Sequence, residues 1–540
     1  MNSRLGRLGT LRVSPALLML LLLPLLTVLP AVPIDETRYL SIAWEMRQGG
    51  SWITLHLNGF PYVDKPPLLF WMINASWSVL GTSLWSARAM VLLFGMGCVE
   101  LCRRLERRLA PDATGQAAWL LMGFIFFALF SGVVMFDVTL CFCVLLGFLA
   151  IVSYVQTGSR GALLMLFVAS VLGVLAKGPV ALLHLALPIL AARWWSAAEQ
   201  PASWRKVIAM VLVAVLGGLP TLLWAWAAVH NLSATDAHNL LLRQTAGRVV
   251  ESFAHKRPFW WYLPWVPVLL LPWPILVRWR RVAAVVREQS GAAAARFGLS
   301  ASVPALIAFC LVSGKQMHYL LPLLPGVALL LGTWLRRDRE LLSSRRMWAM
   351  VVVFAALWLW SRFGRPPMPL VDTNGDTAIW LHLLSASLIA LAALYLLISR
   401  RARPERRSTV AMLLLTMALL PIARVQVLGA MDLTDIAQRV ASLRERGIPM
   451  ARSDDEPGLI TFLARLPEPL AAAPDPLAWA KQYPDGYFLF YSGRGRVPPG
   501  VEDSAKFANG WVGLVSSRAA LANPKLLERP PKSAPRLDVN

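Results

Sequence analysis

Apolar blocks of about 20 residues, repeated along most of the chain, constrain its fold more than any other feature, because a block of this length crosses a hydrocarbon core as one helix. Of the 540 residues, 57% are hydrophobic and only 15% are charged, whereas about a quarter are charged in soluble proteins. The chain is therefore a polytopic α-helical membrane protein, for which the blocks predict about 13 transmembrane helices. The predicted spans are 15–33, 84–101, 117–135, 138–155, 161–176, 179–195, 207–229, 260–277, 297–313, 318–335, 347–361, 378–398 and 409–428.

The end of the chain, residues 431–540, differs from the rest because it mixes short apolar runs with Gly and Pro. We expect a small soluble α/β domain there, following a transmembrane domain over residues 1–430. The start of the chain combines basic residues with an apolar stretch and resembles a secretory signal. Because that stretch is long and lacks a clear small-x-small cleavage site, residues 1–33 favour an uncleaved first helix.

The net charge of +23 comes largely from Arg clusters between the apolar blocks. The clusters at 103–108 and 400–407 fall, like most of the others, on alternate connections, which is the pattern of cytoplasmic loops. This distribution argues against a nucleic-acid-binding face. It predicts a cytoplasmic N-terminus and a periplasmic or extracellular C-terminal domain. The five cysteines all lie in apolar segments and imply no disulfide framework.

Isolated charges lie at the opposite, outer side. Asp137 sits between two predicted spans, Lys177 precedes a Gly-Pro break, and Lys315 lies in the turn 313–319 that also holds Tyr319. Each of these residues could simply mark the end of a hairpin. Since ionisable groups near hydrocarbon are costly, their shared side favours one polar site at the outer face.

The first outer loop, residues 34–83, carries further charges. Asp35 and Glu36 precede apolar residues at helical spacing, which predicts a helix on the membrane surface with two acids at its start. Those acids could serve only as helix caps. Further on, Lys65 precedes two prolines that fix an extended turn, so its ammonium could meet a lipid phosphate or extend to the interface without a ligand.

Another outer segment, residues 230–259, holds several cations, among them Arg257, just before the aromatic run Phe259–Tyr262. Such a segment could cover an anionic lipid-linked substrate. It could equally be an ordinary interfacial loop, since aromatic residues collect at membrane interfaces.

Five motifs in order give the chain a family resemblance over residues 32–335. They are Asp35-Glu36-x-Arg38-Tyr39, Asp64-Lys65-Pro66-Pro67-Leu68, the lone Asp137, Lys177-Gly178-Pro179, and Lys315-x-x-x-Tyr319-x-Leu321-Pro322-x-x-Pro325. With these motifs the chain resembles the lipid-dependent membrane glycosyltransferases of the GT-C superfamily, which includes protein mannosyltransferases. It is most similar to the bacterial aminoarabinose transferases that modify lipid A.

The resemblance implies roles for the outer charges. Asp35 would be the principal catalytic acid and Asp137 its partner, and Glu36 is added as a catalytic candidate beside them. The donor phosphate would be held by Lys65 and Tyr319, with Lys315 and Arg257 as further candidates. Lys177 remains an additional candidate at an outer turn. No cofactor is expected to be required, although a divalent metal site at Asp64 and His255 is a further possibility that family members suggest.

The implied reaction is inverting transfer of 4-amino-4-deoxy-L-arabinose from undecaprenyl phosphate to lipid A, without nucleotide or nucleic acid. Two alternatives remain open. A related enzyme could move mannose to protein or galacturonate to lipid A or core sugars. An ion-coupled transporter could use Asp35, Asp137 and Lys177 as a relay, although transporters usually place such charges at the midplane and show inverted repeats.

Overall fold

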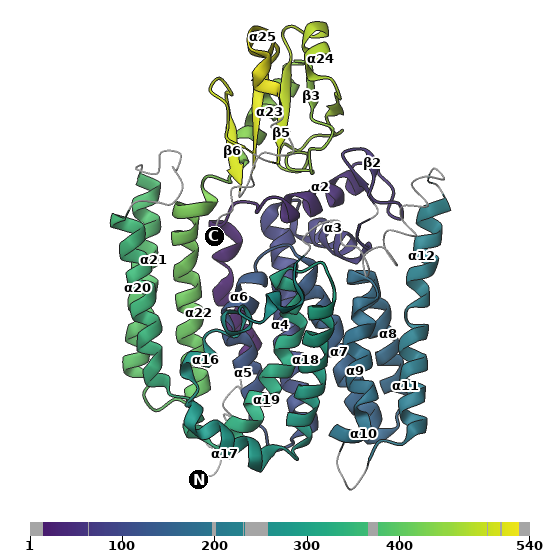
Figure 1. The fold of residues 1–540 in the computed structure, drawn as a ribbon, viewed down its shortest axis with the longest axis vertical. Helices are drawn as coiled ribbons and strands as arrows, with labels where there is room; N and C mark the ends of the chain where they lie inside the picture. The colour runs from purple at the N-terminus through teal and green to yellow at the C-terminus, as the bar shows by residue number, and fades with distance from the viewer. Residues whose placement is uncertain are drawn as a thin grey trace, which may run out of the picture.

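The structure is a computed structural model that describes residues 14–62, 64–196, 201–230, 232, 257–364, 376–493, 495–507 and 510–528. A helical bundle carries a small domain at one end, and the helices α2 (Asp35–Arg47) and α3 (Leu68–Leu80) lie between the two (Figure 1). We call this the domain end of the bundle. The helix α17 (Trp279–Gln289) and the short helix α10 (Ala192–Trp195) lie at the opposite end.

Nine helices in the described part of the chain are long and apolar enough to cross a membrane. Each matches one predicted span, so hydropathy located them correctly. They are α4 (Leu84–Leu109), α7 (Phe136–Thr157), α8 (Arg160–Lys177), α11 with α12 (Trp204–Leu216, Leu219–His230), α18 (Ala293–Leu311), η4 with α19 (Met317–Leu323, Leu324–Arg337), η6 with α20 (Ser344–Arg346, Met347–Phe363), α21 (Asp376–Ile398) and α22 with η7 (Pro404–Ala423, Arg424–Leu428).

The other four predicted spans are shorter or interrupted, unlike the continuous helices that we expected. Prolines explain two breaks: Pro24 precedes α1, and Pro272 precedes α16. Between α5 and α6, Phe124 adopts an extended backbone with ψ of 121°. The pieces are η2 (Pro15–Leu22), α1 (Leu25–Val28), α5 (Gln116–Gly123), α6 (Ile125–Phe130), α9 (Val180–Leu190), α10, η3 (Phe259–Tyr262), α15 (Val266–Leu269) and α16 (Trp273–Leu276).

The C-terminal domain is the α/β unit that the sequence predicts. Its five-stranded sheet has the order β4-β3-β5-β7-β6, in which β3 runs parallel to β4 and β5 while β7 is antiparallel to both of its neighbours. The elements are α23 (Thr434–Glu445), β3 (Met450–Arg452), β4 (Ala471–Ala472), α24 (Pro476–Gln482), β5 (Tyr487–Ser492), β6 (Ser504–Phe507), β7 (Gly510–Ser516), α25 (Ser517–Ala522) and η8 (Pro524–Leu527).

Both faces of this sheet are covered. Along β5, Leu489 packs into the apolar cluster that includes α23, whereas Phe488 and Phe490 pack into a separate cluster with residues of α24 and α25. Successive side chains of a strand point to opposite faces. The domain therefore has two cores of its own, apart from the core of the bundle.

The C-terminal domain docks onto α2. Phe462 stacks on Trp77 of α3, with ring centroids 5.0 Å apart, and meets the edge of Trp44 of α2. The Ser41 hydroxyl donates to the Gly458 carbonyl at 3.0 Å, and the Trp44 indole donates to the Leu466 carbonyl at 2.7 Å. Helix α2 is thus fixed between the bundle and the domain.

Candidate active site

Asp35 begins α2 as predicted and keeps a partly open carboxylate. Its side chain is 38% exposed and lies 3.7 Å from the Arg38 guanidinium. The Tyr39 hydroxyl donates to Asp35 Oδ1 at 3.4 Å. Burial raises the pKa of Tyr39 well above its usual range, and the charge of Asp35 adds to the shift, so the phenol keeps the proton it donates. The carboxylate is oriented but still accessible.

Glu36, the next residue, is used entirely inside the protein. Its two oxygens accept from Arg88 Nε at 2.9 Å and Nη2 at 2.7 Å, and from the backbone amides of Val32 and Val134. Both side chains of the pair are 0% exposed. The structure therefore places Glu36, which we expected to be catalytic, in a structural ion pair without a surface that faces a substrate.

Asp137 lies in the first turn of α7, where the sequence placed an outer turn, and it is 1% exposed. Its Oδ1 is paired with the ammonium of Lys177, the last residue of α8. Its Oδ2 lies 3.8 Å from His318 Nε2 at the start of η4. Three separate turns at the domain end therefore meet at one carboxylate.

Aromatic rings complete this group. Lys177 Nζ lies over the Tyr319 ring, 4.2 Å from its centroid. The rings of His318 and Tyr319 pack edge to face with centroids 4.9 Å apart. A cation held over an aromatic face is stabilised by the ring quadrupole. Lys177 is consequently fixed from two sides, by Asp137 and by Tyr319.

Lys65 approaches the same group from the first loop. Its ammonium lies 6.0 Å from the centroid of Phe136, and the Phe136 ring packs edge to face on Tyr39. The charges of Asp137, Lys177, Asp35 and Lys65 all act on the His318 imidazole. Asp35 and Lys65 thus lie near the Asp137–Lys177 pair at the domain end, through the contacts of Tyr39 and Phe136. Two other charged residues that the sequence singled out, Glu36 and Lys315, do not join this group.

Lys315 and Arg257 have a different arrangement from the one expected. Lys315 is 2% exposed, and its ammonium donates to the carbonyl of Val312 and, at 3.2 Å, to that of Arg257. The Arg257 guanidinium lies 5.8 Å from the Trp261 ring. Lys315 therefore ties the backbone before η3 to the turn after α18, so a direct contact with a donor phosphate does not fit its geometry.

The expected metal ligands do not form a site within the described residues. Asp64 is exposed, and its charge acts on Arg38, while His255 lies outside the described residues. Over the ranges that the structure describes, no group of three or more His, Cys, Asp and Glu side chains could hold a metal ion.

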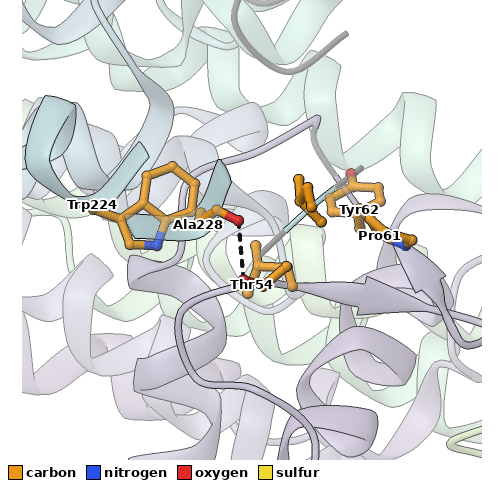
Figure 2. Close-up of a pocket in the computed structure, with 7 residues that line it drawn as sticks. Thr54, Pro61, Tyr62, Trp224 and Ala228 are labelled. Carbon is orange, nitrogen blue, oxygen red and sulfur yellow. Dashed lines mark hydrogen bonds between the residues drawn. The ribbon is translucent and has the colours of Figure 1, made fainter. Parts of the chain in front are cut away.

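The tip of the first loop rests on α12. Figure 2 shows the Thr54 hydroxyl, which donates to the Ala228 carbonyl at 3.1 Å, and the Trp224 indole donates to the Ile53 carbonyl at 3.0 Å. The cavity beside this contact measures about 10 Å³, which is room for about one water. This contact supports the loop that carries Lys65. The cavity beside it is too small for a substrate.

Sequence reasoning missed two residues that organise this region. His318 stood inside the motif from Lys315 to Tyr319 but was not selected. Arg88 stood in the apolar span 84–101, where a lone cation implies a buried acid. The lone Arg88 could therefore have indicated that one of the two adjacent acids is buried in an ion pair and does not share the role of the other.

Comparison with known proteins finds similarity to proteins that are named as lipid-phosphate glycosyltransferases. Residues 64–224 match the family described as dolichyl-phosphate-mannose-protein mannosyltransferase. The undecaprenyl phosphate-α-4-amino-4-deoxy-L-arabinose arabinosyl transferase of Pseudomonas aeruginosa PAO1 is 32% identical over 309 residues, which cover 55% of this chain and 54% of the relative. That of Enterobacter sp. 638 is 30% identical, covering 58% of this chain and 56% of the relative. The chain thus spans about half the length of the curated relatives it matches.

Solved structures match over nearly the whole length. The crystal structure of ArnT from Cupriavidus metallidurans in the apo state has a TM-score of 0.70, and the one bound to undecaprenyl phosphate has a TM-score of 0.68. Each is 18% identical and covers 94% of this chain and 98% of the matched chain. The chain therefore has the GT-C fold, and its resemblance to the aminoarabinose transferases is confirmed.

Proposed function

We propose that this membrane protein transfers 4-amino-4-deoxy-L-arabinose from undecaprenyl phosphate to lipid A, with inversion at the anomeric carbon. The observation that carries the proposal is the grouping of Asp137, Lys177 and His318 at the domain end. Asp35 and Lys65 lie close to this group through Tyr39 and Phe136. The names of the matched relatives supply the sugar and the lipid carrier. The membrane domain (residues 1–430) and the C-terminal domain (residues 431–540) would act together in this reaction.

The donor needs a site for a lipid phosphate that becomes more negative as the sugar leaves. Lys65 and Tyr319 have the chemistry for this role, because an ammonium and a phenol can both donate to phosphate oxygens. Lys177 is held beside Tyr319 by Asp137 and adds a second cation. In this arrangement Asp137 acts as a positioning residue for Lys177.

Transfer breaks the bond between the anomeric carbon and the phosphate oxygen of the carrier, and forms one bond to an acceptor oxygen on the opposite face of the sugar. Undecaprenyl phosphate leaves with the bonding electron pair. If a hydroxyl attacks, Asp35 takes its proton as a general base. If a lipid A phosphate attacks, no proton is lost, and Asp35 orients the cationic amino group of the sugar.

The proposed orientation places the domain end in the periplasm. It is supported by the Arg clusters at the opposite end, where α4 closes with Arg107 and Arg108 and α19 with Arg336 and Arg337. Such clusters mark the cytoplasmic side of membrane proteins. In this orientation the site faces the periplasmic leaflet, where the enzyme would meet its lipid A acceptor.

Mass spectrometry of lipid A tests the proposal. Cells that express the chain should show lipid A heavier by one aminopentose, and cells that express Asp35→Asn should not. Asp485→Asn is the matched control, because this exposed carboxylate pairs with Arg518 on the C-terminal domain, away from α2. Unmodified lipid A with the wild-type chain, in cells that supply the donor, would contradict the proposal.

The match of residues 64–224 to protein mannosyltransferases supports a second candidate, transfer of mannose from a polyprenyl phosphate to protein. The same fold and the same cations would serve, since only the sugar and the acceptor differ. Hexose on periplasmic proteins together with unchanged lipid A would favour this candidate over the first.

A further inference from the structure

A crevice that the proposed reaction does not use lies at the end of the bundle opposite the C-terminal domain. It is an open hollow of about 490 Å³ between α4, α7 and α8. Its lining consists of three guanidiniums, one hydroxyl and two apolar side chains, namely Arg104, Arg107, Arg108, Ser153, Leu149 and Met165. The end of α7 is tied to the end of α4 here, because Gln156 Nε2 donates to the Arg108 carbonyl at 2.7 Å.

The three arginines differ in their ion-pair partners. Arg104 pairs with Glu100 at 2.7 Å. Arg107 and Arg108 are exposed, and neither forms an ion pair with an acid in the described ranges. Positions 104, 107 and 108 lie on one face of a helix. Two guanidiniums therefore face the crevice with capacity for an anion.

Apolar side chains that lie outside the crevice are also exposed on α8. Leu149 and Met165 line the crevice itself. On α8, Leu164 is 64% exposed and Val168 is 40% exposed, and both follow Arg160 toward the domain end. The helix that lines the cationic crevice with Met165 thus also exposes apolar side chains along its membrane-spanning length.

We propose that this crevice binds an anionic phospholipid of the leaflet on this side, independently of the sugar-transfer site. Its phosphate would accept from Arg107 and Arg108, and an acyl chain would lie along Leu164 and Val168. The volume fits a ligand headgroup, since ligand pockets measure about 300–1,000 Å³. Charge topology accounts for arginines at this end of the bundle, but it does not require a crevice with an apolar wall. Basic pockets between transmembrane helices are known to bind anionic lipid headgroups.

Native mass spectrometry of the purified full-length protein tests the site. Phosphatidylglycerol is titrated into wild-type protein, Arg107→Ala/Arg108→Ala and a matched control, Arg400→Ala/Arg401→Ala, which removes two exposed charges from the same end of the bundle. One arginine near a lipid surface contributes about fivefold in affinity, so the crevice variant should bind about 25-fold more weakly. The control should stay within about twofold of wild type, because Arg400 and Arg401 do not line the crevice and the attraction falls off with distance. Equal losses in both variants, or no loss in either, would overturn the proposal.

Two further measurements identify the ligand. Phosphatidylglycerol, but not phosphatidylcholine, should raise the unfolding temperature of the wild-type protein and not of the crevice variant, because a ligand that binds only the folded state stabilises it. Inorganic phosphate at equal concentration should not displace the lipid. Displacement by phosphate would show a simple anion site and contradict a lipid site, whatever the transfer activity.

Discussion

Two buried ion pairs at the domain end, Glu36 with Arg88 and Asp137 with Lys177, differ in how completely their groups are bonded. Arg88 donates to Glu36 and, at 2.7 Å each, to the carbonyls of Leu29 and Pro30, and the pair is 0% exposed. Lys177 retains 12% exposure and rests on an aromatic ring. A fully bonded pair joins segments of the fold, whereas a pair with an open side can rearrange around a ligand. The variants below test this difference by measuring stability and transfer together.

Arg88→Leu should have the largest effect on stability. It leaves the Glu36 carboxylate buried without its cation, which costs about 3–5 kcal/mol. The unfolding temperature in detergent should fall steeply, and transfer should fall only in proportion to the unfolded fraction.

Arg47→Leu is the control on α2, the helix that carries Glu36, because Arg47 is exposed and donates to the Ser78 hydroxyl at 3.2 Å. It should change the stability by less than about 1 kcal/mol. An Arg88→Leu protein that stayed stable but lost transfer would show that the Glu36–Arg88 pair takes part in the active site.

Lys177→Met should lower stability less, by about 2 kcal/mol, since Lys177 is 12% exposed and water can partly replace its ammonium beside Asp137. Transfer should fall about 100-fold or more if the cation contacts the donor phosphate. Assays with purified donor lipid measure both effects. Transfer that decreased only as much as stability would show that the Asp137–Lys177 pair is structural, like the first.

His318→Phe should change stability by about 1 kcal/mol, because the ring contacts with Phe130 and Tyr319 can persist. We expect transfer to fall about tenfold through a less well-held Asp137. His318→Asn, which restores a polar group, should recover part of the loss. Equal transfer by His318→Asn and His318→Phe would show that the imidazole does not help to position Asp137.

Asp35→Asn should have the smallest effect on stability, below about 1 kcal/mol, because its ion pair with Arg38 is long and partly exposed. Transfer should nevertheless be abolished. Near-normal turnover of this variant in a purified lipid assay would exclude Asp35 as the principal catalytic acid.

The sequence predicts the nine long helices and the surface helix α2, since apolar length and helical spacing are local properties. It also predicts that Asp137 and Lys177 lie at turns on one side, because an isolated charge is costly in hydrocarbon. The interruptions in the other four spans were not predicted. Proline positions indicate some of them, such as the break at Pro24, but the extended Phe124 has no such signal.

The main difference between the predicted and the observed site concerns two adjacent acids. Asp35 and Glu36 were grouped because they are neighbours in sequence, yet consecutive residues of a helix point about 100° apart. One carboxylate faces Tyr39 and the opening, and the other faces Arg88 in the core. Contacts between distant segments, such as Asp137 with His318, cannot be read from local patterns without a map of helix packing.

The docking of the C-terminal domain onto α2 links residues more than 400 positions apart, as in the hydrogen bond from Ser41 to Gly458. During synthesis, α2 leaves the ribosome long before its partner segment around Phe462 exists. The surface that presents Asp35 is therefore among the last parts of the molecule to reach its final form, although its residues are among the first to be made.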